Sequence, residues 1–210
     1  MEPITTTTEI LKVKGDWQEV VDNCRTTVGK PPLGKEPSKE FKEQMLISEH
    51  SPIRAISIVW KWKNLKSWVA THWCRHKWEC YIKTQRSDRT GVNRDKLPQD
   101  APVDFTGEAN TQQLIDTFRK RLCRMASIET RRRAEDLKDK IAEVEPELAR
   151  ALVPNCIYRC GCPEMQSCGY YDKIMREDWE VASHDIRTRY AAYNNYYQWE
   201  REQLKKKHAQ

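Results

Sequence analysis

The stretch from His72 to Arg89 concentrates side chains that could bind a phosphorylated ligand. An arginine can place two parallel hydrogen bonds on a phosphate, whereas a lysine acts as a compact point charge. The short segment Ser87-Asp88-Arg89 could form a turn whose backbone N–H groups and guanidinium enclose a phosphate. Residue types and spacing alone leave three alternatives open: a ligand site, a solvated surface and an RNA-contacting patch. The cationic and imidazole side chains of the stretch are His72, Arg75, His76, Lys77, Lys83, Arg86 and Arg89.

Three blocks of sequence, in order, resemble the flavin-dependent thymidylate synthases. Residues 68–77 (Trp-Val-Ala-Thr-His-Trp-Cys-Arg-His-Lys) are similar to the family's signature helix, in which an aromatic-Val-Ala run leads into Gln-Trp-Phe-Arg-His-Arg. Ser87-Asp88-Arg89 resembles the end of that signature, and His50-Ser51-Pro52 resembles an earlier His-Glu-Thr-Pro block. Residues 152–159 resemble the later Leu-Pro-x-Asn block with its Thr-Arg. The blocks extend over most of the chain, which looks like a divergent, phage-like member.

The resemblance implies a fold and a reaction. The implied fold is α+β, with an antiparallel or mixed sheet flanked by long helices, in a homotetramer whose sites are shared between subunits. The implied reaction is reductive methylation of dUMP to dTMP, with FAD as cofactor and methylenetetrahydrofolate and NADPH as co-substrates. In such a reaction an arginine stabilises the charge that develops on the uracil ring, and the reduced flavin supplies the hydride.

The resemblance also implies roles for individual residues. Four of them would hold FAD: Ser51, Arg75, His76 and Lys77. Five would bind dUMP: His72, Ser87, Asp88, Arg89 and Arg159. A late arginine, either Arg187 or Arg189, would polarise the pyrimidine as the catalytic group.

The chain departs from the family's pattern in the middle of the signature. Lys77 replaces an arginine, which keeps the charge but loses the planar fork. Ile82-Lys83 stands where the family has Asn-Glu, and Cys80 replaces a serine. A related flavin-dependent enzyme that modifies a pyrimidine nucleotide differently is therefore the alternative reaction.

Four of the eight cysteines fall within thirteen residues: Cys156, Cys160, Cys162 and Cys168. Four thiolates can hold a structural zinc ion or an iron–sulfur cluster. Paired Cys-x2-Cys motifs are absent, so reduced or locally paired thiols are the competing interpretation. Together with the basic stretch, such a cluster would also suit a metal-stapled nucleic-acid-binding protein, the second class of function.

Composition places the chain among soluble proteins of one domain, residues 1–210. Of its 210 residues, 38% are hydrophobic and 32% charged, and no apolar run approaches the ~20 residues that span a bilayer. Met1–Thr8 lacks a secretory pattern, so the expected location is the cytoplasm, or the host cytoplasm if a phage encodes the protein. The net charge of +6 suits a nucleotide or a phosphorylated cofactor as well as nucleic acid, and the family resemblance favours the small molecules.

The elements expected to position these residues follow from periodicity and breakers. The N-terminal half predicts a strand and a helix within Glu9–Val28, a helix at Lys39–Ile47, a strand at Ala55–Lys63 and a helix at Ser67–Lys77. The polar segment Arg86–Gly107 predicts a loop.

The C-terminal half predicts mainly helices. Thr111–Leu152 is a long helical region with a possible break near Pro146, and 154–169 is an irregular Cys-rich loop. Tyr170–Lys207 predicts one or two helices. Their aromatic stripe suits core or subunit packing, with a base-stacking platform as the alternative; it comprises Tyr190, Tyr193, Tyr196, Tyr197 and Trp199.

Overall fold

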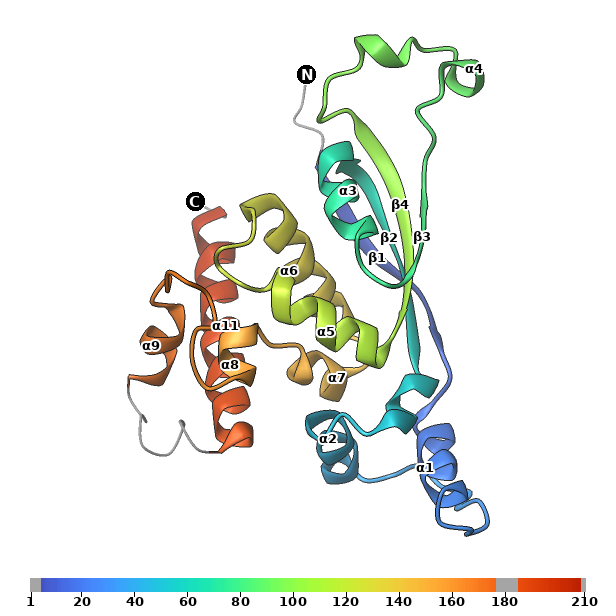
Figure 1. The fold of residues 1–210 in the computed structure, drawn as a ribbon, viewed down its shortest axis with the longest axis vertical. Helices are drawn as coiled ribbons and strands as arrows, with labels where there is room; N and C mark the ends of the chain where they lie inside the picture. The colour runs from blue at the N-terminus through green and yellow to red at the C-terminus, as the bar shows by residue number, and fades with distance from the viewer. Residues whose placement is uncertain (1–4, 177–184, 209–210) are drawn as a thin grey trace.

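A four-stranded antiparallel sheet forms one side of the protein, and most of the helices gather beside it (Figure 1). The computed structural model describes residues 5–176 and 185–208. Within these ranges the strand order is β1-β2-β4-β3, and every neighbouring pair is antiparallel. The predicted α+β class is therefore confirmed. The strands are β1 (Thr7–Lys14), β2 (Ser57–Lys66), β3 (Glu79–Ile82) and β4 (Pro102–Asn110).

The helices begin where the sequence supplies side-chain caps. Asp16, Ser38 and Ser127 each accept a backbone N–H of the first turn that follows them. Asn110 and Gln113 form a reciprocal capping box. The α-helices are α1 (Trp17–Thr26), α2 (Lys39–Ile47), α3 (Ser67–Cys74), α4 (Ser87–Thr90), α5 (Thr111–Arg121), α6 (Ile128–Ala142), α7 (Pro146–Ala151), α8 (Asn155–Tyr158), α9 (Tyr170–Met175) and α11 (Ile186–His208), with 3-10 turns η1 (Ser51–Ala55) and η2 (Arg94–Lys96).

Most of the predicted elements are confirmed within a few residues. Strand β1 begins two residues before the predicted span Glu9–Val28, and helix α1 lies inside it. Helix α2 has the predicted bounds. The predicted strand Ala55–Lys63 starts two residues later, because Ala55 belongs to η1. The predicted helix Ser67–Lys77 ends at Cys74, before the signature triplet.

The predicted loop Arg86–Gly107 is wrong in its last part. Strand β4 begins at Pro102, and Val103, Phe105 and Gly107 alternate as buried positions along it. Proline and glycine favour turns, so Pro102 and Gly107 led to the prediction of a loop in place of a strand. The short edge strand β3 was also not predicted, since four residues give little periodicity.

The long helical region is interrupted twice. Helix α5 ends at Arg121 and α6 begins at Ile128, a break that the sequence did not reveal. The second interruption precedes Pro146, as expected, because proline is favoured at the first position of a helix. The 154–169 segment is irregular apart from the single turn α8.

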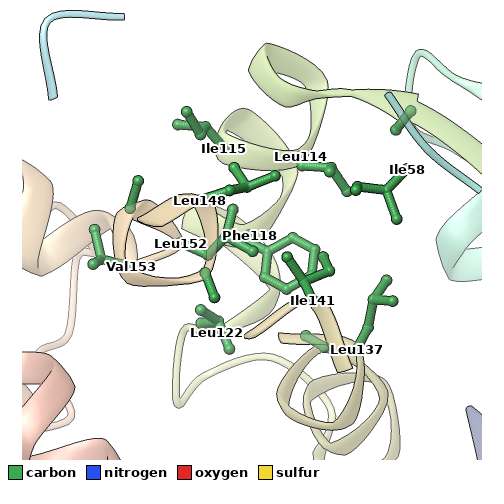
Figure 2. Packing of buried hydrophobic residues seen from close by; sticks show 14 of the residues in the cluster. Ile58, Leu114, Ile115, Phe118, Leu122, Leu137, Ile141, Leu148, Leu152 and Val153 are labelled. Carbon is green, nitrogen blue, oxygen red and sulfur yellow. The ribbon is translucent and has the colours of Figure 1, made fainter. Parts of the chain in front are cut away.

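The core joins the sheet to the helices. Figure 2 shows Phe118 of α5 among Leu137 and Ile141 of α6 and Leu148 and Leu152 at α7, all with at most 1% exposure. Ile58 of β2 reaches the same cluster. This packing sets the position of α5, whose last turn carries the basic residues described below.

The aromatic stripe of α11 is mostly a packing surface. Tyr190, Tyr193 and Tyr197 are buried, whereas Trp199 is 52% exposed. Tyr196 contacts Trp199 at a centroid distance of 5.5 Å. The buried members favour the core interpretation of the stripe over a base-stacking platform. No helix in the described ranges is both long and apolar enough to cross a membrane.

Gly107 makes room for an indole ring. A Cβ atom at this position would lie 2.4 Å from the Trp60 ring, which is fully buried. We expect Gly107→Ala to lower the free energy of unfolding by roughly 1–3 kcal/mol, the usual cost of overpacking a core. Urea denaturation would measure it. Thr106→Ala, on the next and less buried position of β4, is the control, and equal losses in both variants would contradict this explanation.

Candidate functional site

A pocket of about 670 Å³ brings distant basic residues together. We call it the cationic pocket. Its wall includes Arg75, His76 and Lys77 after α3, and Arg159, which lies more than eighty residues later at the end of α8. Helix α5 and the turn η1 complete the wall. Its cationic side chains are Arg54, Arg75, Lys77, Arg119, Lys120 and Arg159.

Positive charge dominates this pocket. Asp116 is the single carboxylate among the described residues that line it, and Arg119 already pairs with Asp116 and Glu49. Arg119 also lies over the Tyr158 ring, 3.5 Å from the centroid. Arg75 and Lys77, in the same pocket wall, are exposed. A volume in the usual range of small-molecule sites and a surplus of cations suit an anionic ligand.

His76 is held neutral in the pocket wall. Burial, followed by the Arg121 and Lys120 cations, lowers the pKa of its imidazole from 6.5 to about 4. The Nε2 atom accepts a hydrogen bond of 2.7 Å from Nε of Arg121. A neutral ring that accepts at Nε2 carries its proton on Nδ1, so His76 has one N–H to donate.

This arrangement predicts a pH dependence of stability. Between pH 6.5 and about 4 the unfolded chain binds a proton at His76 and the folded chain does not, so the free energy of unfolding falls as the pH drops through this window. Urea denaturation at several pH values would measure the slope. His76→Gln is expected to flatten it, and an unchanged slope in that variant would show that other groups cause the acid loss.

His72 borders a second pocket of about 530 Å³, which is lined by α3 and by the segment 82–86. Its Nδ1 lies 2.9 Å from Oγ1 of Thr130 in α6. Burial, followed by Arg121 and Arg75, lowers the pKa of His72. Arg75 lines both pockets, so the second pocket adjoins the cationic one.

Ser87, Asp88 and Arg89 lie apart from these residues. They form the short helix α4 at the far end of the sheet, well away from α8 (Figure 1). All three are exposed, and none of them lines either pocket. Asp88 accepts hydrogen bonds of 3.0 and 2.7 Å from Arg86, which orders the turn. Within one chain the structure therefore does not bring Ser87–Arg89 together with Arg159.

Ser51, the earliest predicted cofactor residue, is exposed at the start of η1. It does not itself line the cationic pocket, although Arg54 of the same turn does. The role of Ser51 stays a prediction.

The two candidate catalytic arginines also lie outside the cationic pocket. Arg189 is 6% exposed and donates to the carbonyl oxygens of Ile157, at 2.9 Å, and Tyr158, at 3.2 Å. It thereby fixes the turn that carries Arg159. Arg187 is exposed and donates to Gln44 of α2. A catalytic role for either stays a prediction.

Four residues of this region were not found from the sequence. Arg54, Arg119 and Lys120 line the pocket, and Arg121 holds His76 and donates to the carbonyl oxygen of His72 at 2.7 Å. The run Arg119-Lys120-Arg121 was visible as a basic helix end, but such runs commonly offset the helix dipole.

The predicted metal ligands do not form a ready-made site. In the described ranges, no group of three or more His, Cys, Asp or Glu residues is arranged to hold a metal ion. Cys160 is exposed, and its Sγ lies 3.4 Å from the Tyr171 hydroxyl. Cys156, Cys162 and Cys168 line a common small cavity, which Cys160 does not line.

No protein-family model and no curated protein sequence matches this chain. The structure is similar to the crystal structure of the UMP/dUMP methylase PolB from Streptomyces cacaoi bound with 5-Br dUMP, with a TM-score of 0.56 and 14% sequence identity. The match covers 70% of this chain and 94% of PolB. At this identity the likeness establishes a related fold.

Proposed function

We propose that this chain is a flavin-dependent thymidylate synthase, which methylates dUMP to dTMP with methylenetetrahydrofolate. The observation that carries the proposal is the meeting of the signature triplet Arg75-His76-Lys77 with Arg159 in one cationic pocket. These are the residues to which the family resemblance assigns cofactor and nucleotide contacts. The related fold of a UMP/dUMP methylase supports the same assignment.

The pocket residues fit a phosphorylated cofactor such as FAD. Six cations and one carboxylate line a cavity of about 670 Å³, so the pyrophosphate of a dinucleotide would find charge partners there. Arg75 and Lys77 would bind the phosphates, the Nδ1–H of neutral His76 would donate to a cofactor oxygen, and Ser51 would contact the same group. When bound, reduced FAD supplies the hydride, and NADPH would reduce it.

Arg159, at the end of α8, would bind the nucleotide in the same pocket. Its Nε is held 3.1 Å from Oδ1 of Asn155, so the guanidinium starts from a fixed position. Arg189, through its two bonds to the α8 carbonyls, would position Arg159. Arg187, although it lies outside the cationic pocket of its own chain, remains the candidate that would polarise the uracil ring.

The exposed segment Ser87–Arg89 at the tip of the β3–β4 connection fits this function only if the chain forms an oligomer. Being remote from the pocket of its own chain, it would reach the pocket of another subunit and bind dUMP there. A homotetramer with shared sites is therefore part of the proposal.

A second candidate is a related methylation of another pyrimidine nucleotide. Ile82 and Lys83 occupy the place of the family's Asn-Glu, and both line the second pocket beside His72. This replaces an amide and a carboxylate by an apolar and a cationic side chain, which alters what the pocket can recognise. UMP is the substrate to compare, since the related fold belongs to a UMP/dUMP methylase.

The test is an assay of the purified full chain loaded with FAD. Incubated with methylenetetrahydrofolate, NADPH and either dUMP or UMP, it is expected to convert dUMP to dTMP, detected by chromatography and mass. Faster conversion of UMP would favour the second candidate. A folded, flavin-loaded protein that converts neither would refute both, and a colourless protein that binds RNA with steep salt dependence would support the nucleic-acid-binding class.

Matched variants link activity to the pocket. Lys77→Ala is expected to weaken FAD binding about tenfold or more, the scale for one charge-assisted contact. Lys30→Ala, which alters another exposed lysine outside the pocket, should leave FAD binding unchanged. Equal affinities in the two variants would contradict the placement of the cofactor.

A further inference from the structure

Four thiols from three separate segments surround one small cavity. Cys123 lies in the connection between α5 and α6, Cys156 lies in α8, and Cys162 and Cys168 come from the segment before α9. All four line a cavity with about 10 Å³ of free space. That volume suits a single ion and is too small for an organic ligand.

The four thiols at this cavity differ in how far they are buried. Cys156 is 8% exposed, Cys123 and Cys162 are half-buried, and Cys168 is exposed. The cluster therefore lies at the boundary between the core and the surface.

Cys160 has a different environment from these four. It is exposed, its thiol lies next to the Tyr171 hydroxyl, and it does not line the cavity. The fourth cysteine at the cavity is instead Cys123, more than thirty residues earlier in the chain. Sequence spacing could not have indicated this residue.

We propose that Cys123, Cys156, Cys162 and Cys168 bind one structural zinc ion. Four cysteine thiolates form a common closed tetrahedral zinc site. Each thiol releases its proton to solvent on binding, so four Zn–S bonds replace four S–H bonds. Among the described residues these thiols do not yet form a metal-binding group, so they would have to draw together as the ion binds.

The position of the cluster indicates what the ion would stabilise. Cys123 follows Arg121 by two residues, and Cys156 precedes Arg159 by three. Arg121 holds His76, and Arg159 lines the cationic pocket. Zinc would therefore tie together two walls of that pocket, although the ion itself stays outside it. The zinc proposal does not depend on the proposed reaction.

The experiment is metal analysis of the purified full chain by inductively coupled plasma mass spectrometry, after growth with zinc. The wild type is expected to hold about one zinc per chain, the stoichiometry of a closed site with four cysteine ligands. Cys123→Ser is expected to lose most of it, and Cys160→Ser is the matched control that should retain it. Zinc retained by Cys123→Ser but lost by Cys160→Ser would overturn the ligand set.

A variant that can still coordinate zinc distinguishes loss of a ligand from misfolding of the chain. Cys168→His is expected to retain zinc, because imidazole is also a zinc ligand, whereas Cys168→Ser should lose it. Cobalt added to the metal-free wild type should give the visible absorption of tetrahedral thiolate coordination. A wild type without bound zinc and without that cobalt spectrum, or one that holds iron and inorganic sulfide instead, would overturn the proposal.

Discussion

Lys138→Met is expected to lower the free energy of unfolding by roughly 3–5 kcal/mol, because it leaves three buried acceptors without a donor at about 1–3 kcal/mol each. The Lys138 amine is buried and donates to the carbonyl oxygens of Ala149, at 2.7 Å, and Leu152, at 2.8 Å. It also donates to Oδ1 of Asn194 in α11, at 2.9 Å. Removing a buried cation offsets part of this loss, so the total stays below the sum of the three.

The reason for so large an effect is that one amine joins three helices. Lys138 belongs to α6, its two carbonyl partners lie at the C-terminal end of α7, and Asn194 belongs to α11. The Tyr193 and Tyr197 rings lie 5.1 and 5.0 Å from the amine and add a favourable cation–π contribution. Methionine keeps the length of the side chain but donates no hydrogen bond.

Urea denaturation followed by circular dichroism would measure the loss. Lys140→Met is the matched control: it lies on the same helix, its side chain is 42% exposed, and it pairs only with Glu143 among the described residues. Exposed ion pairs contribute about 0–1 kcal/mol, so this control should remain close to the wild type. Similar midpoints for the two variants would show that the Lys138 contacts contribute little.

Arg159→Ala is expected to weaken dUMP binding about a hundredfold, the scale for losing a bidentate charge-assisted contact. Arg89→Ala is expected to do the same if the tip of one subunit completes the pocket of another. Isothermal titration of the flavin-loaded protein with dUMP would measure both. Arg132→Ala, exposed on α6 and outside both pockets, is the control that should bind normally.

Mixing the two variants distinguishes a shared site from a local one. Co-expressed Arg159→Ala and Arg89→Ala chains would form some sites with an intact Arg159 from one chain and an intact Arg89 from the other. These mixed oligomers are expected to regain part of the activity that each variant lacks. No recovery in mixed oligomers, or normal dUMP binding by Arg89→Ala, would contradict the shared site.

The sequence by itself determined the class of fold and most of its elements. Local patterns suffice where capping residues and periodicity agree, as at Ser38 before α2 and along Ile58 to Trp62 in β2. It also predicts Arg75, Lys77 and Arg159 as phosphate-binding residues, by type and by resemblance, and the structure places all three in one pocket. It missed β4 and predicted a loop there, because Pro102 and Gly107 indicate a turn until their neighbours are known.

Only the tertiary structure decided which of these residues meet. The packing of α5 against α6 and α8 brings Arg119, Arg121 and Arg159 near the signature triplet, and no local pattern encodes that contact. The tertiary structure also separates Ser87–Arg89 from Arg159 within one chain, and it places Cys123 instead of Cys160 at the thiol cavity. Spacing along a chain measures distance in space only within one helix or strand, whereas burial of the shared core determines how the elements are joined.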